Sequence, residues 1–93
     1  MLSKIPINLE GIEKGDVDKE ILRAAIIAEL DAINLYEQMA NLTQDKNIKA
    51  VLQDVAKEEK THVGEFQTML LRLDQEQVEE LDAGKKEVEE MAE

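Results

Sequence analysis

The sequence predicts an all-α protein: an antiparallel two-helix hairpin plus a short C-terminal helix, which a second copy of the chain completes to a four-helix bundle. Apolar residues recur at the helical spacing i, i+3, i+4, i+7 through two long segments. One proline, four glycines and two aromatic side chains among 93 residues also favour helices over sheets. A polar segment, "NLTQDKN" at 41–47, separates the periodic segments and is typical of a connection between antiparallel helices.

Length, charge and cysteine content restrict the functions that are open to the chain. A chain of 93 residues forms at most one small domain. Its 11 Lys and Arg against 22 Asp and Glu give a net charge of −11, the wrong sign for nucleic acid or an anionic membrane. The absence of Cys excludes thiolate metal sites and thiol nucleophiles. The longest apolar run, 24–28, is far short of a membrane span, and we expect a cytoplasmic protein.

Residues 1–15 are expected to form an irregular N-terminal arm. They contain Pro6, Gly11 and Gly15 and show no sustained periodicity. If the arm docks on the rest of the chain, its contacts come from its apolar side chains, which are Ile5, Ile7, Leu9 and Ile12.

The helical hairpin is expected at 16–73. Asp16 or Asp18 is an acceptable N-cap for the first helix. A loop of about four or five residues then leads to a second helix that begins near Ile48 and runs for about 26 residues. The expected inward stripe comprises positions 22, 25, 26, 29, 32, 33, 36, 39 and 40 of the first helix and positions 48, 51, 52, 55, 59, 62, 66, 69, 70 and 73 of the second.

Residues 74–93 are expected to form a shorter C-terminal helical segment. Asp74 is suited to cap this helix, and Gly84 is expected to interrupt it. A thin apolar stripe favours packing over a dedicated recognition surface, although both interpretations stay open, and it consists of Val78, Leu81, Val88 and Met91.

The hairpin requires a partner, because two helices with one apolar stripe each bury little surface when they meet only each other. The most economical partner is a second copy of the same chain, related by a two-fold axis. We therefore expect a homodimer.

Three ionisable residues interrupt the apolar stripe. Glu29 stands on the first helix, while Glu59 and His62 form a Glu-x-x-His pair on one turn of the second. Burying an ionised carboxylate costs several kcal/mol unless it is paired or binds a metal. These residues are either a buried ion-pair cluster, with His62 protonated, or the ligands of a metal.

Charge favours the metal. In a homodimer the ion-pair cluster collects four carboxylates and at most two imidazolium groups, which leaves a charge of about −2 in a low-dielectric interior. Two divalent cations make the same site neutral when the imidazoles are neutral. An oxygen-rich ligand set with one imidazole per metal suits iron, with manganese as the alternative. One Glu from each of two helices and a Glu-x-x-His pair from each of the other two is the pattern of di-iron and di-manganese bundles.

The segments "AELDAINLYEQ" at 28–38 and "EEKTH" at 58–62 resemble the encapsulated ferritins, short ferritin-like proteins that act with encapsulin shells. The resemblance implies a ferritin-like bundle with a ferroxidase centre between two protomers. Its iron ligands and catalytic residues would be Glu29, Glu59 and His62 of each chain. It further implies rings of such dimers, for example decamers, that work inside an encapsulin nanocompartment and oxidise Fe(II) for iron storage as ferric mineral.

Two further residues are candidates for supporting roles. Tyr36 lies two turns after Glu29, and it either hydrogen-bonds a ligand carboxylate or is an ordinary core tyrosine. The family often has an acidic residue directly before the first ligand, where this chain has Ala28. Asp31 is the candidate for guiding metal into the site, and a solvated helical aspartate is the alternative.

The leading hypothesis from the sequence is therefore an enzyme, a ferroxidase with an inter-subunit di-iron site. The first alternative is a non-enzymatic module that binds and delivers iron, which shares the same ligands and differs only in turnover. The second is a structural helical oligomer or cargo adaptor, in which Glu29, Glu59 and His62 form an ion-pair cluster without metal.

Overall fold

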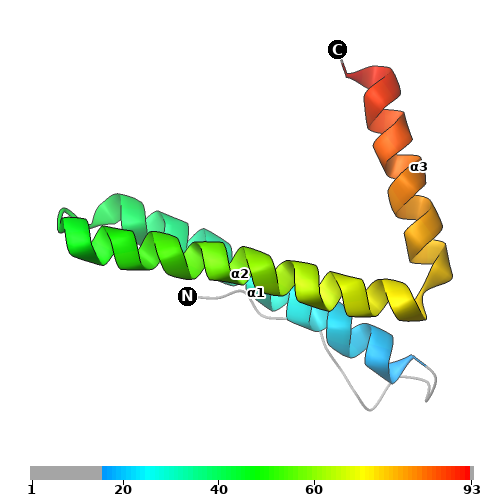
Figure 1. The fold of residues 1–93 in the computed structure, drawn as a ribbon, viewed down its shortest axis with the longest axis horizontal. Helices are drawn as coiled ribbons and strands as arrows, with labels where there is room; N and C mark the ends of the chain where they lie inside the picture. The colour runs from blue at the N-terminus through cyan, green and yellow to red at the C-terminus, as the bar shows by residue number, and fades with distance from the viewer. Residues whose placement is uncertain (1–15, 93) are drawn as a thin grey trace.

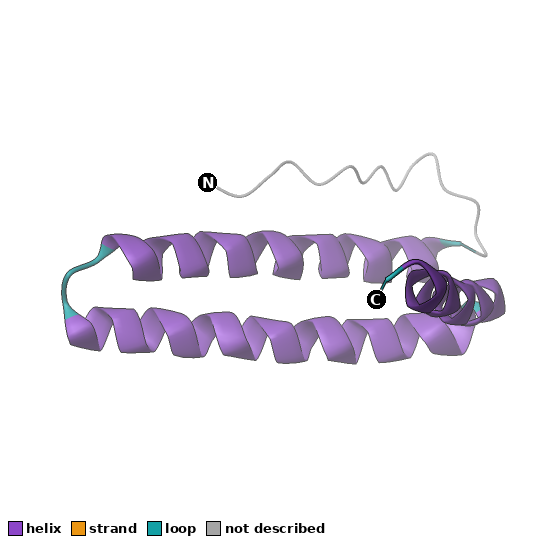
Figure 2. Cartoon of the chain, turned by 90° about the horizontal axis from the view of Figure 1, so that it is seen from above, coloured by secondary structure: helices purple, strands orange, loops and turns teal. Residues whose placement is uncertain are grey.

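Residues 16–92 form three helices, α1 (Val17–Leu42), α2 (Lys46–Leu73) and α3 (Gln75–Met91). The computed structural model describes residues 16–92, so the expected arm and its docking residues lie outside the described part. Helices α1 and α2 run antiparallel and side by side, and α3 leaves the end of α2 at a steep angle (Figures 1 and 2). The all-α expectation is confirmed, with the hairpin and the shorter C-terminal helix in the expected order, while dimerisation stays a prediction.

The loop between α1 and α2 is shorter than expected, because α2 begins earlier. Only residues 43–45 separate the helices. The Asp45 carboxylate accepts hydrogen bonds from the amides of Asn47 at 2.8 Å and Ile48 at 3.0 Å. This side-chain cap satisfies two amide groups at the start of the helix, so α2 begins at Lys46 rather than near Ile48.

Gly84 does not interrupt α3, contrary to the expectation from the sequence. The helix continues through it, and within residues 16–92 no glycine has a positive φ. Glycine inside a helix costs about 1 kcal/mol relative to alanine, which weakens a helix without ending it. An ion pair of 2.9 Å between Asp82 and Lys86 spans the glycine and supports the turn around it.

Asp74 joins all three helices at the corner between α2 and α3. Its backbone leaves the helical region, with φ −135° and ψ 87°. Its carboxylate accepts a hydrogen bond from the Gln77 amide at 3.0 Å, which caps α3 as expected. The other carboxylate oxygen pairs with Nη2 of Arg23 on α1 at 2.9 Å. One side chain thus both begins α3 and ties that corner to α1.

The core of the single chain is small. Within the described residues only four apolar side chains are buried, and they are Ile33, Ala40, Ala56 and Leu70. Ala56 lies outside the expected stripe, because α2 meets α1 along a line displaced from that stripe's centre. No helix among residues 16–92 is long and apolar enough to cross a lipid bilayer.

Much of the expected stripe is not covered by the neighbouring helix. Large apolar side chains of α2 that were expected to face inward are about half exposed: Ile48 is 52% exposed, Val51 62%, Met69 47% and Leu73 46%. Two helices cover each other only along their line of contact, so the outer edge of each stripe stays open. The hairpin consequently has an exposed apolar face.

Asp74 gives the fold a defined acid sensitivity. The Gln77 amide, and then the Arg23 guanidinium with Lys19 nearby, hold the pKa of the Asp74 carboxyl below its ordinary value of 3.8, although burial opposes them. A lowered pKa in the folded state contributes stability that is complete above the ordinary pKa and is lost as pH falls through the lowered value.

We predict that Asp74→Asn, which keeps a capping oxygen but removes the charge, lowers Tm at pH 7 by about 3 °C. The difference from the unmodified chain should begin to shrink as pH falls below 3.8, where the unfolded chain takes up the proton, and should shrink further as pH falls through the lowered pKa of Asp74, where the native carboxyl also loses its charge. Thermal melts from pH 7 to pH 2.5 measure both effects. Asp82→Asn is the control, because its ion pair is exposed and should be worth little. Equal stability of Asp74→Asn and the native chain at pH 7 would contradict the prediction.

Candidate metal centre

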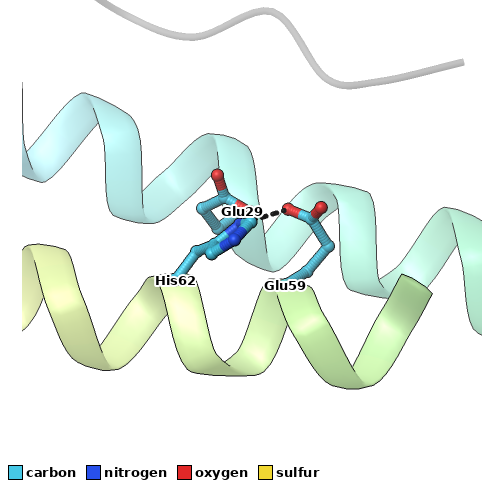
Figure 3. Close-up of side chains that lie close together, drawn as sticks. All are labelled: Glu29, Glu59 and His62. Atoms are coloured by element: carbon cyan, nitrogen blue, oxygen red, sulfur yellow. Dashed lines mark ion pairs between the residues drawn. The ribbon is translucent and has the colours of Figure 1, made fainter. Parts of the chain in front are cut away.

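The antiparallel hairpin brings together the three ionisable residues of the stripe. Glu29 lies near the middle of α1, and the i, i+3 spacing places Glu59 and His62 one turn apart on the side of α2 near α1. Figure 3 shows the three side chains converging between the two helices. The residues that the sequence singled out as ligands are therefore neighbours in space.

Both carboxylates approach the same imidazole nitrogen. His62 Nδ1 lies 3.5 Å from Glu29 Oε2 and 3.6 Å from Glu59 Oε2. These distances are longer than the usual 2.7–3.2 Å of a hydrogen bond from nitrogen to oxygen. One donor atom from each of the three residues lies within 4.8 Å of the others. The three groups thus surround a common point without bonding tightly to one another.

One carboxylate oxygen of Glu29 makes this arrangement costly as it stands. Glu29 Oε2 is buried and has no hydrogen-bond partner among the described residues. A buried carboxylate oxygen without a partner typically costs about 1–3 kcal/mol or more. His62 cannot balance both carboxylates, because even a protonated imidazolium leaves one of the two negative charges uncompensated. A cation at the common point would satisfy Glu29 and balance both carboxylates.

The donor set fits a divalent metal of the first transition row. Donor atoms bonded to one ion at about 2.1 Å are separated from one another by about 3–4 Å, and the distances from His62 Nδ1 to the two carboxylate oxygens fall in this range. Two carboxylates and one imidazole suit iron or manganese better than structural zinc, which prefers thiolate and more imidazole. Three protein donors would also leave coordination positions open for further ligands.

The cluster opens toward the exposed apolar face of the hairpin. The side chains of Glu29 and Glu59 are 19% and 18% exposed, whereas that of His62 is 43% exposed. His62 lies in the same helical row as Val55, Met69 and Leu73, so a helix pair packed on this face would cover the cluster. A second copy of the chain could therefore both close the site and add ligands to it.

Asp31 and Tyr36 do not join the cluster in the single chain. Asp31 follows Glu29 by two residues, which directs it to another side of α1, and it is half-buried. Tyr36 is also half-buried and lies about 10 Å along the helix axis from Glu29. The supporting roles suggested for both residues remain predictions.

A polar feature on the other side of the hairpin was missed in the sequence. Lys60 of α2 pairs with Glu37 of α1 at 2.9 Å, on the side of α2 that faces away from His62. The pairing across helices could not be read from the sequence. The sequence does, however, contain a signal, since the lysines of the second helix fall on one side of a helical wheel.

Two long antiparallel helices, with Glu on one and a Glu-x-x-His pair on the other, have the arrangement found in each half of ferritin-like carboxylate bundles. Residues 20–93 match the sequence family described as Rubrerythrin. The chain therefore belongs to the rubrerythrin family, whose fold is ferritin-like.

Individual relatives confirm the resemblance to encapsulated ferritins. The chain is 65% identical over 72 residues to the ferritin-like-encapsulin shell fusion protein of Pyrococcus furiosus, covering 77% of this chain. It is 46% identical over 56 residues, 60% of this chain, to the encapsulin nanocompartment cargo protein EncC of Myxococcus xanthus. The matches span only 21% and 43% of those two proteins.

A solved structure supports the same assignment over nearly the whole fold. The crystal structure of the encapsulated ferritin domain from Pyrococcus furiosus superposes with a TM-score of 0.84 at 53% sequence identity. The match covers 99% of this chain and 94% of that domain. The three-helix arrangement described here is therefore that of an encapsulated ferritin domain.

We predict that Glu29→Gln leaves the metal-free chain as stable as the native one, or raises Tm by up to about 5 °C, because it removes a buried charge. The same change should abolish stabilisation by Mn(II), used as a redox-stable substitute for iron. Thermal melts in chelator and then with added Mn(II) measure both effects.

Glu58→Gln is the matched control for Glu29→Gln, because Glu58 is exposed on α2 and lies outside the cluster. It should leave Tm and the effect of Mn(II) unchanged. A metal-free Glu29→Gln chain that is clearly less stable than the native one would mean that Glu29 is already well paired, and would count against the metal centre.

Proposed function

We propose that the chain is a ferroxidase, which oxidises Fe(II) to Fe(III) at a di-iron site shared between two copies. The observation that carries the proposal is the buried oxygen of Glu29, which has no hydrogen-bond partner among residues 16–92 and lies 3.5 Å from His62. In this proposal Glu29, Glu59 and His62 of both chains are the ligands and the catalytic residues. Iron is the metal, and manganese is the alternative.

The two-chain site rests on charge and on apolar surface. Two copies contribute four carboxylates and two neutral imidazoles, whose charge two Fe(II) ions balance. The exposed side chains beside His62, including Met69 and Leu73, would be buried in the same step. Burial of apolar surface contributes about 25 cal/mol per Å², so these side chains favour a four-helix bundle around the metals.

Dioxygen is the oxidant in the simplest form of the reaction, with peroxide as an alternative. Each of two Fe(II) ions loses one electron, and one dioxygen molecule takes up these two electrons and two protons to give hydrogen peroxide. The anionic ligands Glu29 and Glu59 favour this direction, because they stabilise Fe(III) more than Fe(II). His62 contributes a neutral donor and keeps the site from excess negative charge.

Tyr36 is proposed to support the ligand carboxylates, and Asp31 to attract Fe(II) toward them.

The relatives suggest where the reaction takes place. One is a fusion with an encapsulin shell and another is the cargo of an encapsulin nanocompartment. We infer that this chain likewise works with an encapsulin shell protein, inside a cytoplasmic nanocompartment where ferric product is stored as mineral. Rings of dimers, such as decamers, would supply several such sites side by side.

We predict that the native chain binds close to one Fe(II) per chain and oxidises it rapidly when air is admitted, and that Glu59→Ala lowers the oxidation rate by about 100-fold. Glu59→Ala removes one of only two carboxylates that each chain offers. The measurement is an anaerobic Fe(II) titration followed by air, with absorbance of the ferric product recorded over time.

Glu58→Ala is the control for this experiment, because it removes a neighbouring exposed carboxylate. It should oxidise iron like the native chain. Full activity of Glu59→Ala would refute the proposed centre. Iron binding without faster oxidation would instead indicate an iron carrier. Absence of iron binding would indicate that Glu29, Glu59 and His62 form an ion-pair cluster in a structural oligomer or adaptor.

We further predict that Fe(II) drives association, because a site split between chains couples metal binding to dimerisation. Native mass spectrometry or light scattering under anaerobic conditions should show a larger oligomer fraction with Fe(II) than without it. His62→Gln should reduce this response while keeping the apolar face intact. Identical mass distributions with and without Fe(II) would contradict the shared site.

A further inference from the structure

The lysines of α2 are gathered on one side of the helix. At about 100° per residue, all four fall within a sector about 80° wide. The acidic residues of α2 lie outside this sector: Asp54 borders it, three residues before Lys57, Glu58 and Glu65 lie further round the helix, and Glu59 belongs to the cluster with Glu29 and His62. The lysine side of α2 consists of Lys46, Lys49, Lys57 and Lys60.

A cavity of about 380 Å³ opens between α1 and α2 on this lysine side. The buried side chains of Ala40 and Ala56, each 2% exposed, form its base. Because alanine is short, the longer side chains around it stand above an open space. These surrounding residues are all polar or charged, and they are Glu37, Asn41, Gln53, Lys57 and Lys60.

The charges around this cavity are not balanced. Lys60 pairs with Glu37 at 2.9 Å, and Lys57 makes no ion pair within the described residues. Lys57 and Lys60 are three residues apart on one helix, a spacing at which like charges destabilise the helix. Two ammonium groups and one carboxylate therefore leave an excess positive charge, in a chain whose net charge is −11. The repulsion between the lysines would be relieved by an anion between them.

We propose that this cavity binds a small oxyanion, such as phosphate or a carboxylate, between Lys57 and Lys60. Lysine ammonium groups are strong donors to such oxygens. The amides of Asn41 and Gln53 supply further donors, and Glu37 orients Lys60 while limiting the affinity through its own charge. The cavity lies on the side of the hairpin away from His62, so binding does not depend on iron at the candidate metal centre.

The test is to titrate the full, metal-free chain with inorganic phosphate and, separately, with citrate. Calorimetry measures binding during each titration. The native chain should bind at least one of them saturably, and the preferred anion tells whether phosphate or carboxylate is the better ligand. Lys57→Gln should weaken binding about fivefold, and Glu37→Gln should strengthen it about fivefold. Lys86→Gln, which alters a lysine of α3 that pairs with Asp82, should leave the affinity unchanged.

Opposite effects of Lys57→Gln and Glu37→Gln distinguish a binding site from loss of structure, which would weaken binding in both. Circular dichroism checks that each variant keeps its helix content. Absence of saturable binding of either anion by the native chain would overturn the proposal. Equal affinities of native and Lys57→Gln chains, or a shift in the same direction for both cavity variants, would also overturn it.

Discussion

Glu29 places a buried carboxylate oxygen 3.5 Å from His62 and without a hydrogen-bond partner among residues 16–92, and the rest of the candidate site can be understood from that placement. Glu59 adds a second negative charge on the facing helix, and His62 stands within 3.6 Å of both. This arrangement lowers the stability of a chain that binds no cation there, because apolar residues of similar size would pack in its place without a desolvation penalty. Its presence is reasonable if a cation completes it.

The hairpin has two sides with different chemistry. One side carries the cluster and exposed apolar residues such as Met69 and Leu73. The other carries the cavity around Lys57 and Lys60. Because the helices meet along a line of small or medium side chains, including Ala40 and Ala56, neither side is covered by the chain itself. The single chain thus has little core of its own, and its surfaces are available to a second copy and to ligands.

Helix type, helix order and the meeting of Glu29 with Glu59 and His62 could be predicted, because each follows from local spacing and from the antiparallel connection. Burial was predicted less well, since periodicity shows which side of a helix is apolar but not how much of it one neighbour covers. Ala56 was missed because α2 meets α1 along a line displaced from the centre of the apolar stripe. The expectation that Gly84 interrupts the C-terminal helix was wrong, because α3 continues through it. The contact between Arg23 and Asp74 joins residues far apart in the chain, and no local pattern indicates it.

A small rotation at the Asp74 corner moves the far end of α3 by several ångströms. This helix of 17 residues is about 25 Å long, and none of its side chains is buried against the hairpin. A change of about 10° at the corner would move its far end by about 4 Å at that length. The capped and ion-paired Asp74 carboxylate therefore helps to set the direction of α3. Substitutions at Arg23 or Asp74 would then change the direction of α3 while leaving Glu29, Glu59 and His62 in place.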